Sequence, residues 1–331
     1  MTTTIIEPQA PATAAATSQL PDIAVLMRYQ DSFARALATR YQIHYLLPGE
    51  QLERLPAAVR QAIRAVVTVG GRGLNPFSAD DFPALELIAV TGAGYEQVDV
   101  AAARERGIEV SYGPGTNAAC VADHALALLL AAARGVVRAG IDAASGIARP
   151  QQLAQLTGKK VGIIGLGHIG KDIARRLQGF DAEIFYHGRR PQADSAYHFV
   201  SDVTALAHAV DFLVVSCPGG SATRHLVNAG VLQALGPDGI LVNVARGSVV
   251  DTTALAAALR SNTIAGAALD VIEGEPHVDP ALRALPNLIL TPHVAAQSPE
   301  TQAAVLALLS ANLESFFAGN GVLTPAPVAL G

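Results

Sequence analysis

The chain has 331 residues, which is longer than single hydrophobic cores usually grow, so its length predicts two domains. Half of the residues are hydrophobic and 15% are charged, a balance that suits buried cores and excludes a largely disordered chain. The net charge of -5 and the pI near 6.0 argue against a nucleic-acid-binding protein, which needs a basic face.

The cysteines, the amino terminus and the apolar runs bear on the compartment. There are only two cysteines, Cys120 and Cys217, so no disulfide framework is predicted and a reducing compartment fits. Residues 1–20 have no basic region and no long apolar core, and we expect a disordered tail there instead of a signal peptide. The most apolar run, residues 125–133, is far shorter than the roughly 20 residues that span a membrane. We therefore expect a cytoplasmic protein with no membrane partner.

Short apolar runs alternate with helical patterns along nearly the whole chain. In the first part, buried strands are predicted at residues 23–27, 43–47, 65–69 and 85–90. The segments between them, such as "DSFARALATRY", have the length and spacing of helices. This alternation predicts a parallel sheet with helices on both faces.

A second series of strands begins at Lys159 and runs from "KKVGIIG" to "NLILTPHV". A helix is predicted over "DTTALAAALRSN", with Asp251 as its N-cap. The last helical run, residues 299–318, is too short for a third domain and is expected to return to the first one. We predict an α/β fold of two doubly wound parallel-sheet domains. A Rossmann dinucleotide-binding domain (113–294) would be inserted into a flavodoxin-like substrate-binding domain (21–112 and 295–331).

Three glycines stand between a predicted strand and a predicted helix in "VGIIGLGHIGK". Gly165 suits a tight turn, Gly167 lets the backbone approach a pyrophosphate, and Gly170 lets the helix pack closely on the strand. A glycine-rich turn alone is a weak signal, but strand, turn and helix occur here in order. We therefore predict a dinucleotide-binding loop formed by Gly165, Leu166, Gly167, His168, Ile169 and Gly170.

The next predicted strand ends in "FYHGRRPQ". An NAD site usually has an Asp or Glu about 20 residues beyond the glycines, where it binds the ribose hydroxyls. Here Gly188 stands in or next to that place, and Arg189 and Arg190 follow. Guanidinium groups bind a phosphate through charge-assisted hydrogen bonds, whereas an acid repels it. We predict that the two arginines bind the 2′-phosphate of NADP; the alternative is a solvated loop pair.

Several further motifs occur in a fixed order: "GAGYEQVDV", "CPGGSATRHLVN", "LVNVARGSVVD", "AALDVIEGEP" and "LTPHVAAQSPET". With the glycine loop, they closely resemble those of the D-isomer-specific 2-hydroxyacid dehydrogenases, from about residue 66 to the C-terminus. Because of "HGRR", the sequence is most similar to the NADP-dependent glyoxylate/hydroxypyruvate reductases. The resemblance implies NADPH-dependent reduction of small 2-oxo acids, such as glyoxylate and hydroxypyruvate, to D-2-hydroxy acids. It also implies a homodimer whose interface includes residues 121–134, for which an ordinary core helix is the alternative.

The resemblance assigns the catalytic roles to Arg246, Glu275 and His293. His293 matches the general acid, and an imidazole can be protonated near neutral pH, which suits proton delivery. Glu275 matches the carboxylate that pairs with this histidine and favours its imidazolium form. Arg246 matches the arginine that binds the substrate carboxylate and polarises the carbonyl. Taken singly, each of the three has an ordinary structural explanation.

Further matches would complete the site. The backbone of Ala93 and Gly94 is expected to form a small anion nest for the substrate carboxylate, and Arg72 is expected to line the same space. The resemblance places four residues near the nicotinamide and its ribose: Cys217, Pro218, Ala245 and Asp270. Of these, Cys217 is expected to line the site as a buried side chain and not to act as a nucleophile. No metal site is expected.

Two alternatives to a glyoxylate or hydroxypyruvate reductase are open. A 2-ketogluconate or aryl-pyruvate reductase of the same family would differ in the size of its substrate pocket. A non-catalytic NADP(H)-sensing protein would bind cofactor without turnover, which the presence of Arg246, Glu275 and His293 disfavours. One departure from the family pattern is that Ala295 and Ala296 stand where many members have a Gly-Ser pair.

Overall fold

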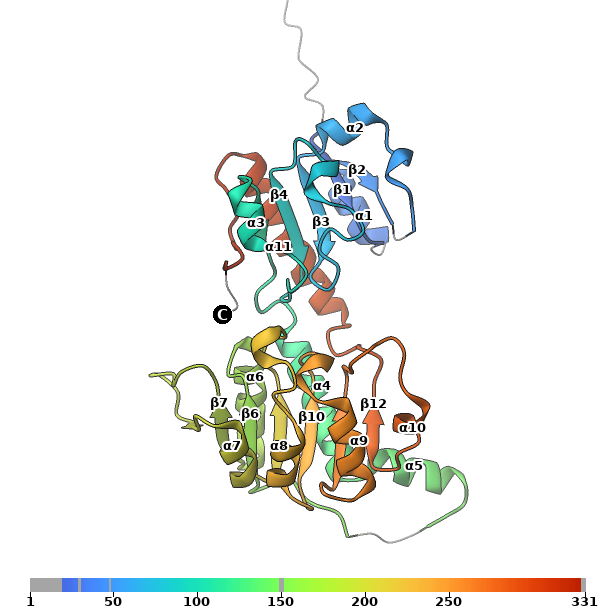
Figure 1. Ribbon diagram of the computed structural model, residues 1–331, viewed down its shortest axis with the longest axis vertical. Coiled ribbons are helices and arrows are strands. Elements are labelled where there is room, and N and C mark those ends of the chain that lie inside the picture. Colours follow the sequence, from blue (N-terminus) through green and yellow to red (C-terminus); the bar gives the residue numbers. More distant parts are fainter. Residues whose placement is uncertain (1–19, 29–30, 48, 149–151, 329–331) are drawn as a thin grey trace, which may run out of the picture.

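The computed structural model describes residues 20–328 with gaps at 29–30, 48 and 149–151 (Figure 1). The expected disordered tail, residues 1–20, lies outside the described residues apart from Leu20. The described chain forms two α/β units, each built on its own parallel sheet. The prediction of two doubly wound parallel sheets is confirmed.

The first sheet has five parallel strands in the order β2-β1-β3-β4-β5, which is the flavodoxin-like arrangement. The apolar runs predicted as strands correspond to its first four strands, and β5 was not predicted separately. The strands are β1 (Asp22–Val25), β2 (Gln42–Tyr45), β3 (Ala65–Val69), β4 (Leu87–Thr91) and β5 (Glu109–Ser111). The helices that follow them are α1 (Asp31–Ala38), α2 (Ala57–Ala62) and α3 (Val100–Glu105).

The second sheet has seven parallel strands in the order β12-β11-β10-β9-β6-β7-β8. The chain order reverses between β6 and β9, and ligands of such sheets bind outside the carboxyl ends of the strands at this point. The strands are β6 (Lys160–Ile164), β7 (Glu183–His187), β8 (His198–Phe199), β9 (Phe212–Val215), β10 (Ile240–Asn243), β11 (Gly266–Leu269) and β12 (Leu288–Leu290).

Helices cover both faces of the second sheet. One apolar cluster joins it to α4 (Ala118–Ala133) and α6 (His168–Leu177), with α5 (Val136–Ala144) following α4. Another cluster covers the opposite face and contains side chains of α7 (Val203–Ala209), α8 (Ala229–Leu235) and α9 (Thr252–Arg260), while α10 (Pro280–Arg283) precedes β12. Asp251 caps α9 as predicted, because its carboxylate accepts a 2.9 Å hydrogen bond from the Ala254 amide.

The last helix, α11 (Pro299–Phe317), leaves the second sheet and packs on the first (Figure 1). Its buried residues Leu309, Leu313 and Phe316 share an apolar cluster with β1, β3 and β4. The exact boundaries of the two domains stay a prediction. In the part of the chain that the structure describes, no single helix is long and apolar enough to cross a membrane; the bent pair α4–α5 reaches that length and composition only when its two halves are taken together.

The packing of α11 gives a test of the fold. Leu313 is fully buried between α11 and the first sheet. Replacing Leu313 with Ala leaves a cavity, and we expect the free energy of unfolding to fall by about 2–5 kcal/mol. Urea denaturation measures this loss. The matched control is Glu314→Ala on the exposed face, whose surface ion pair with Arg40 contributes at most about 1 kcal/mol. Equal losses in the two variants would show that α11 does not pack on the first sheet through Leu313.

Candidate active site

The predicted catalytic residues follow three neighbouring strands of the second sheet. Arg246 comes three residues after β10, Glu275 lies in the loop after β11, and His293 comes three residues after β12. Since β10, β11 and β12 are adjacent and parallel, their carboxyl ends lie along one edge of the sheet. The fold therefore places all three residues at the edge where doubly wound sheets bind their ligands.

His293 and Glu275 form the pair that the sequence predicted. His293 Nδ1 lies 3.2 Å from Glu275 Oε2. The His293 side chain is half exposed, so its ring is accessible to a bound molecule. Its backbone has a positive φ of 55°, which is uncommon outside glycine and is found where a site fixes a side chain in a required position.

The conformation around His293 depends on Asp270, which is almost completely buried at the end of β11. Its carboxylate accepts hydrogen bonds of 2.9 Å from the amides of Val294 and Ala295, and one of 2.6 Å from the Thr291 hydroxyl. The Asp270 carbonyl accepts a further bond, of 2.9 Å, from the His293 amide. Asp270 thus holds the loop that carries the proposed general acid, and its predicted contact with the cofactor stays a prediction.

Arg246 meets the first domain at the turn predicted to bind substrate. Its Nη2 lies 2.9 Å from Glu96 Oε1, and its Nη1 donates a 2.7 Å hydrogen bond to the Ala245 carbonyl. The guanidinium lies directly against Gly94, because a Cβ on that residue would overlap Arg246 Nη2. The structure therefore brings the predicted nest at Ala93 and Gly94 together with the predicted carboxylate-binding arginine.

Two residues of this arrangement escaped the sequence analysis. Asn243 is fully buried, donates a 3.0 Å hydrogen bond to the Arg246 carbonyl and accepts one of 3.0 Å from the Ala245 amide. It fixes the turn that presents Arg246, and its only sequence signal is one amide in an apolar strand. The residues next to Glu96 in the sequence do not indicate its pairing with Arg246, because that partner is 150 positions away in the chain.

Arg72 is placed differently from the other predicted substrate contacts. Its Nη1 donates a 2.6 Å hydrogen bond to the Leu26 carbonyl, at the end of β1. Its half-buried guanidinium therefore supports the carboxyl edge of the first sheet. A role in binding substrate stays a prediction.

The glycine loop fits a dinucleotide. Gly165 has a φ of 98°, and a Cβ there would lie 2.6–2.9 Å from atoms of Cys217. A Cβ on Gly170 would overlap the Gly165 carbonyl, whereas Gly167 has open space beside it. Gly167 is also the N-cap of α6 and has no side chain to cover the free amides, which leaves the helix terminus available for a phosphate.

The remaining loop residues surround this opening. Leu166 is buried, and its carbonyl accepts a 2.7 Å hydrogen bond from Gln192 Nε2, which fastens the loop to the segment after β7. His168 is exposed at the start of α6, and its ring would lie 3.2 Å from a Cβ on Gly115 of the connecting segment. Ile169 is half-buried against the apolar cluster of α4 and α6.

Arg189 and Arg190 are exposed just beyond β7, where the sequence predicted them to meet a phosphate. Gly188 leaves the space beside them open, since a Cβ there would have no neighbour closer than 3.9 Å. Burial raises the pKa of Tyr95 in the first domain, and the positive charge of Arg189 partly opposes this rise. The charge of Arg189, at the carboxyl end of β7, thus acts on a residue of the first domain.

The other predicted cofactor contacts lie at the ends of β9 and β10. Cys217 and Ala245 are buried, and Pro218 is exposed. Burial raises the pKa of the Cys217 thiol to about 11, so the thiol stays protonated at neutral pH. A protonated, buried thiol agrees with the expectation that Cys217 lines the site and is not a nucleophile.

Comparison with protein families decides which family the chain represents. The profile described as "D-isomer specific 2-hydroxyacid dehydrogenase, NAD binding domain" matches residues 126–295, which include the glycine loop, Arg246, Glu275 and His293. The chain belongs to this family. The resemblance predicted from the motifs is thus confirmed.

Curated members of the family are similar over most of the chain. A 2-ketogluconate reductase from Gluconobacter oxydans is 38% identical over 311 residues, covering 93% of this chain and 99% of that protein. Glyoxylate/hydroxypyruvate reductase A HPR2 from Arabidopsis thaliana is 40% identical over 269 residues, covering 80% of this chain and 86% of that protein. The two relatives are named for different 2-oxo acids.

Solved structures share the same two-sheet fold. A 2-hydroxyacid dehydrogenase from Ketogulonicigenium vulgare superimposes with a TM-score of 0.86 at 41% identity, covering 93% of this chain and 98% of that chain. An NADPH-dependent glyoxylate/hydroxypyruvate reductase from Sinorhizobium meliloti, in complex with NADP and malonate, gives a TM-score of 0.83 at 36% identity, covering 94% of this chain and 98% of that chain.

The two cysteines of this D-2-hydroxyacid dehydrogenase give a test of the glycine-loop environment. Alkylation requires the thiolate, and at pH 8 only about one in a thousand Cys217 side chains is ionised if its pKa is about 11. We expect iodoacetamide at pH 8 to label the half-exposed Cys120 well before Cys217, as measured by peptide mass spectrometry. Cys217 should become reactive only as the pH approaches 11 or the protein unfolds. Equal labelling rates at pH 8 would contradict the buried placement of Cys217.

Proposed function

We propose that the protein uses NADPH to reduce small 2-oxo acids, glyoxylate and hydroxypyruvate among them, to D-2-hydroxy acids. The observation that carries this proposal is the geometry of one edge of the second sheet. It places Arg246 against the Gly94 turn and the His293–Glu275 pair two strands away. A cation for a carboxylate and a proton donor for a carbonyl are what the reduction of a 2-oxo acid requires.

Each residue has a distinct task in this reaction. NADPH bound on the loop at Gly165, Gly167 and Gly170 would supply the hydride that adds to the carbonyl carbon. Arg246 binds the substrate carboxylate and polarises the carbonyl, and His293 donates a proton to the carbonyl oxygen. Glu275 orients the imidazole through Nδ1 and stabilises its charged form, which leaves Nε2 for the substrate.

The preference for NADPH rests on Arg189 and Arg190. Both guanidinium groups are exposed beyond β7, where an NAD enzyme would have an acid. The open space at Gly188 gives a ribose phosphate access to them. The similarity to a structure solved with NADP supports the same preference.

The choice among 2-oxo acids has a specific rival. The 2-ketogluconate reductase of G. oxydans matches nearly the full length of the chain, which favours 2-ketogluconate as a second candidate substrate. We favour the smaller acids because relatives from plants and archaea that match 78–80% of the chain are named glyoxylate or glyoxylate/hydroxypyruvate reductases. A non-catalytic sensor is the weakest alternative, since the chain has Arg246, Glu275 and His293.

Steady-state kinetics test the proposed function and the cofactor preference together. NADPH and NADH would each be assayed with glyoxylate, hydroxypyruvate, phenylpyruvate and 2-ketogluconate. For Arg189→Ala, we expect the KM for NADPH to rise about tenfold or more and the KM for NADH to change little, because only NADPH carries the 2′-phosphate. The matched control is Arg175→Ala on α6, an exposed arginine paired with Asp172.

The outcomes separate the alternatives. If the protein oxidised NADPH with none of these acids, the result would favour a sensor and overturn the proposed reaction. Turnover highest with 2-ketogluconate would assign the second candidate substrate. The proposed cofactor preference would be wrong if the enzyme used NADH as efficiently as NADPH and the Arg189→Ala variant had the same kinetics as the wild type. "HGRR" would then be a solvated loop.

We further propose that the protein is a homodimer whose interface includes α5 and the exposed apolar residues Ile147 and Leu153 that follow it. Seven residues of α4 are buried in the core of its own chain, which is the alternative considered for residues 121–134. The exposed apolar surface lies further along. Five of the ten large apolar side chains that are exposed in the described residues belong to this segment: Val136, Val137, Ile141, Ile147 and Leu153.

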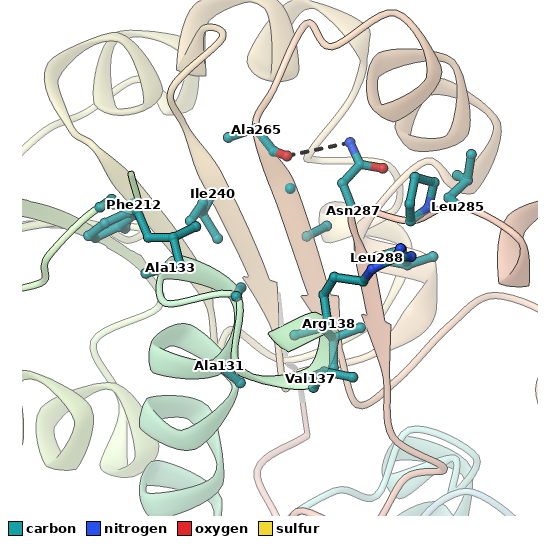
Figure 2. A pocket seen from close by; sticks show the side chains of 18 of the residues that line it. Ala131, Ala133, Val137, Arg138, Phe212, Ile240, Ala265, Leu285, Asn287 and Leu288 are labelled. Atoms are coloured by element: carbon teal, nitrogen blue, oxygen red, sulfur yellow. Dashed lines mark hydrogen bonds between the residues drawn. The ribbon is translucent and has the colours of Figure 1, made fainter. Parts of the chain in front are cut away.

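A cavity of about 820 Å³ lies beside this segment, at the amino ends of the strands and away from the catalytic edge. Figure 2 shows it between α5, which carries Val137 and Arg138, and the first residues of β10 and β12. An apolar helix over an open cavity leaves apolar surface in water that a second copy of the chain would cover.

Sedimentation velocity tests the dimer. We expect the wild type to sediment as a dimer and the double variant Val137→Asp, Ile141→Asp as a monomer, because two carboxylates would have to be buried in the interface. Leu323→Asp, at another exposed apolar position, should leave the dimer intact. A monomeric wild type would refute the proposal.

A further inference from the structure

One loop of the second domain touches both catalytic loops. It is the segment 218–227 between β9 and α8, which contains "PGGSATRHLV". Neither the sequence analysis nor the proposed reaction gives this segment a task beyond Pro218. Its contacts lead to His225, a histidine outside the catalytic pair.

On one side, the segment holds the loop that carries Arg246. The His225 amide donates a 2.8 Å hydrogen bond to the Ser248 carbonyl, and the Val227 amide donates one of 3.0 Å to the Val249 carbonyl. Gly219 lies under the stem of Arg246, since a Cβ there would come within 2.8 Å of Arg246 Cγ. The backbone after Arg246 and the base of its side chain are thus both in contact with segment 218–227.

On the other side, the His225 ring holds the loop that carries Glu275. His225 Nε2 lies 2.9 and 3.0 Å from the two carboxylate oxygens of Glu273. Glu273 is separated from Glu275 only by Gly274, whose positive φ of 82° makes the intervening turn. A displacement of Glu273 is therefore passed within two residues to the carboxylate that orients His293.

The two catalytic loops also touch each other beneath this contact. A Cβ on Gly247 would overlap the backbone of Ile272, so the residue after Arg246 packs against the residue before Glu273. This close packing brings the backbone of Gly247 against the residues that lead to Glu273. The His225–Glu273 pair is one of the side-chain contacts that hold Glu273.

The charges around the His225 ring favour the pair. Asp251 Oδ2 lies 3.9 Å from His225 Nδ1, so the ring has a carboxylate on each side. Arg224 Nη1 lies 3.0 Å from Glu273 Oε1, but the Arg224 side chain is 60% exposed and its contribution is screened by water. His225 is one third exposed and is the more sheltered partner of Glu273.

The backbone at His225 has a conformation that glycine can also adopt. His225 has a φ of 51°, in the left-handed region where glycine is the least strained residue. The chain accepts this strain and has a side chain there that reaches Glu273. Replacing His225 with Gly would therefore remove the ring without straining the backbone.

We propose that His225 is a positioning residue: through Glu273 it couples the loop of Arg246 to the loop of Glu275 and so sets the alignment of the His293–Glu275 pair. This proposal rests on the proposed function for its catalytic consequence. The coupling of the loops is a property of the fold and can be measured without substrate.

The first test uses His225→Gly, which suits the left-handed backbone and removes only the ring. We expect kcat/KM for the 2-oxo acid to fall about tenfold or more, because small displacements of catalytic groups can cost up to about 100-fold. The basic limb of the kcat/KM profile for reduction should move to lower pH, since reduction needs the imidazolium of His293 and a loosened Glu275 stabilises it less. A purely structural role would lower activity at all pH values without moving the limb.

Two further variants complete the design. Asn262→Gly is the matched control, because Asn262 has a φ of 53° in an exposed turn after α9, away from the catalytic edge; it should leave the profile unchanged. Glu273→Ala removes the same pair from the other side without altering residue 225. We expect it to reproduce the shift, and the double variant with His225→Gly to add little, as for two residues that act through one contact. Glu273→Ala also keeps the test valid if His225→Gly does not fold.

Hydrogen exchange of the ligand-free protein separates this proposal from the proposed function. We expect peptides covering residues 271–278 to exchange faster in His225→Gly than in the wild type, and no change in Asn262→Gly. An inactive wild type with this exchange pattern would refute the proposed reaction and leave the coupling standing. Unchanged exchange, or a pH profile identical to that of the wild type in both His225→Gly and Glu273→Ala, would overturn the coupling.

Discussion

The conformation of the loop around His293 depends on the hydrogen bonds that the buried carboxylate of Asp270 accepts. Removed from water, it is satisfied by two consecutive amides and a hydroxyl, and these bonds hold His293 in a backbone conformation that it would not adopt alone. His124 of α4 adds a side-chain contact, with Nε2 2.9 Å from the Thr291 hydroxyl and 3.3 Å from Asp270 Oδ1. The end of β11, helix α4 and the loop of His293 all contact this one carboxylate, so the packing of the domain and the placement of the proposed general acid depend on the same group.

A second constraint acts between the domains. Arg246 belongs to the second sheet, yet its guanidinium lies against Gly94 and pairs with Glu96 of the first. A substrate carboxylate bound there would meet groups from both domains at once, and its binding energy would be available to hold them together. A side chain at position 94 would have to displace the Arg246 guanidinium and the Glu96 carboxylate from this contact.

Features that depend on neighbours in the chain could be predicted from the sequence, and features that depend on distant partners could not. The glycine loop is local: turn, helix start and close packing follow one another within six residues. The Asp251 cap and the buried strands are local for the same reason. Asn243, Glu96 and His225 had no such signal, because each acquires its task only when strand ends or domains meet. Arg72 shows the converse, since a charged residue at the expected edge makes its visible contact with a carbonyl of its own sheet.

The path of α11 has a mechanical consequence. The chain leaves the second sheet just after β12, and residues 294–298 connect His293 to a helix that packs on the first sheet. Any rotation of the first domain would therefore pull on backbone that begins one residue beyond His293. The Asp270 carboxylate accepts hydrogen bonds from the amides of Val294 and Ala295, which lie in that connection. In such a rotation these two hydrogen bonds would confine bending to the residues beyond Ala295 and would keep His293, the proposed proton donor, in place.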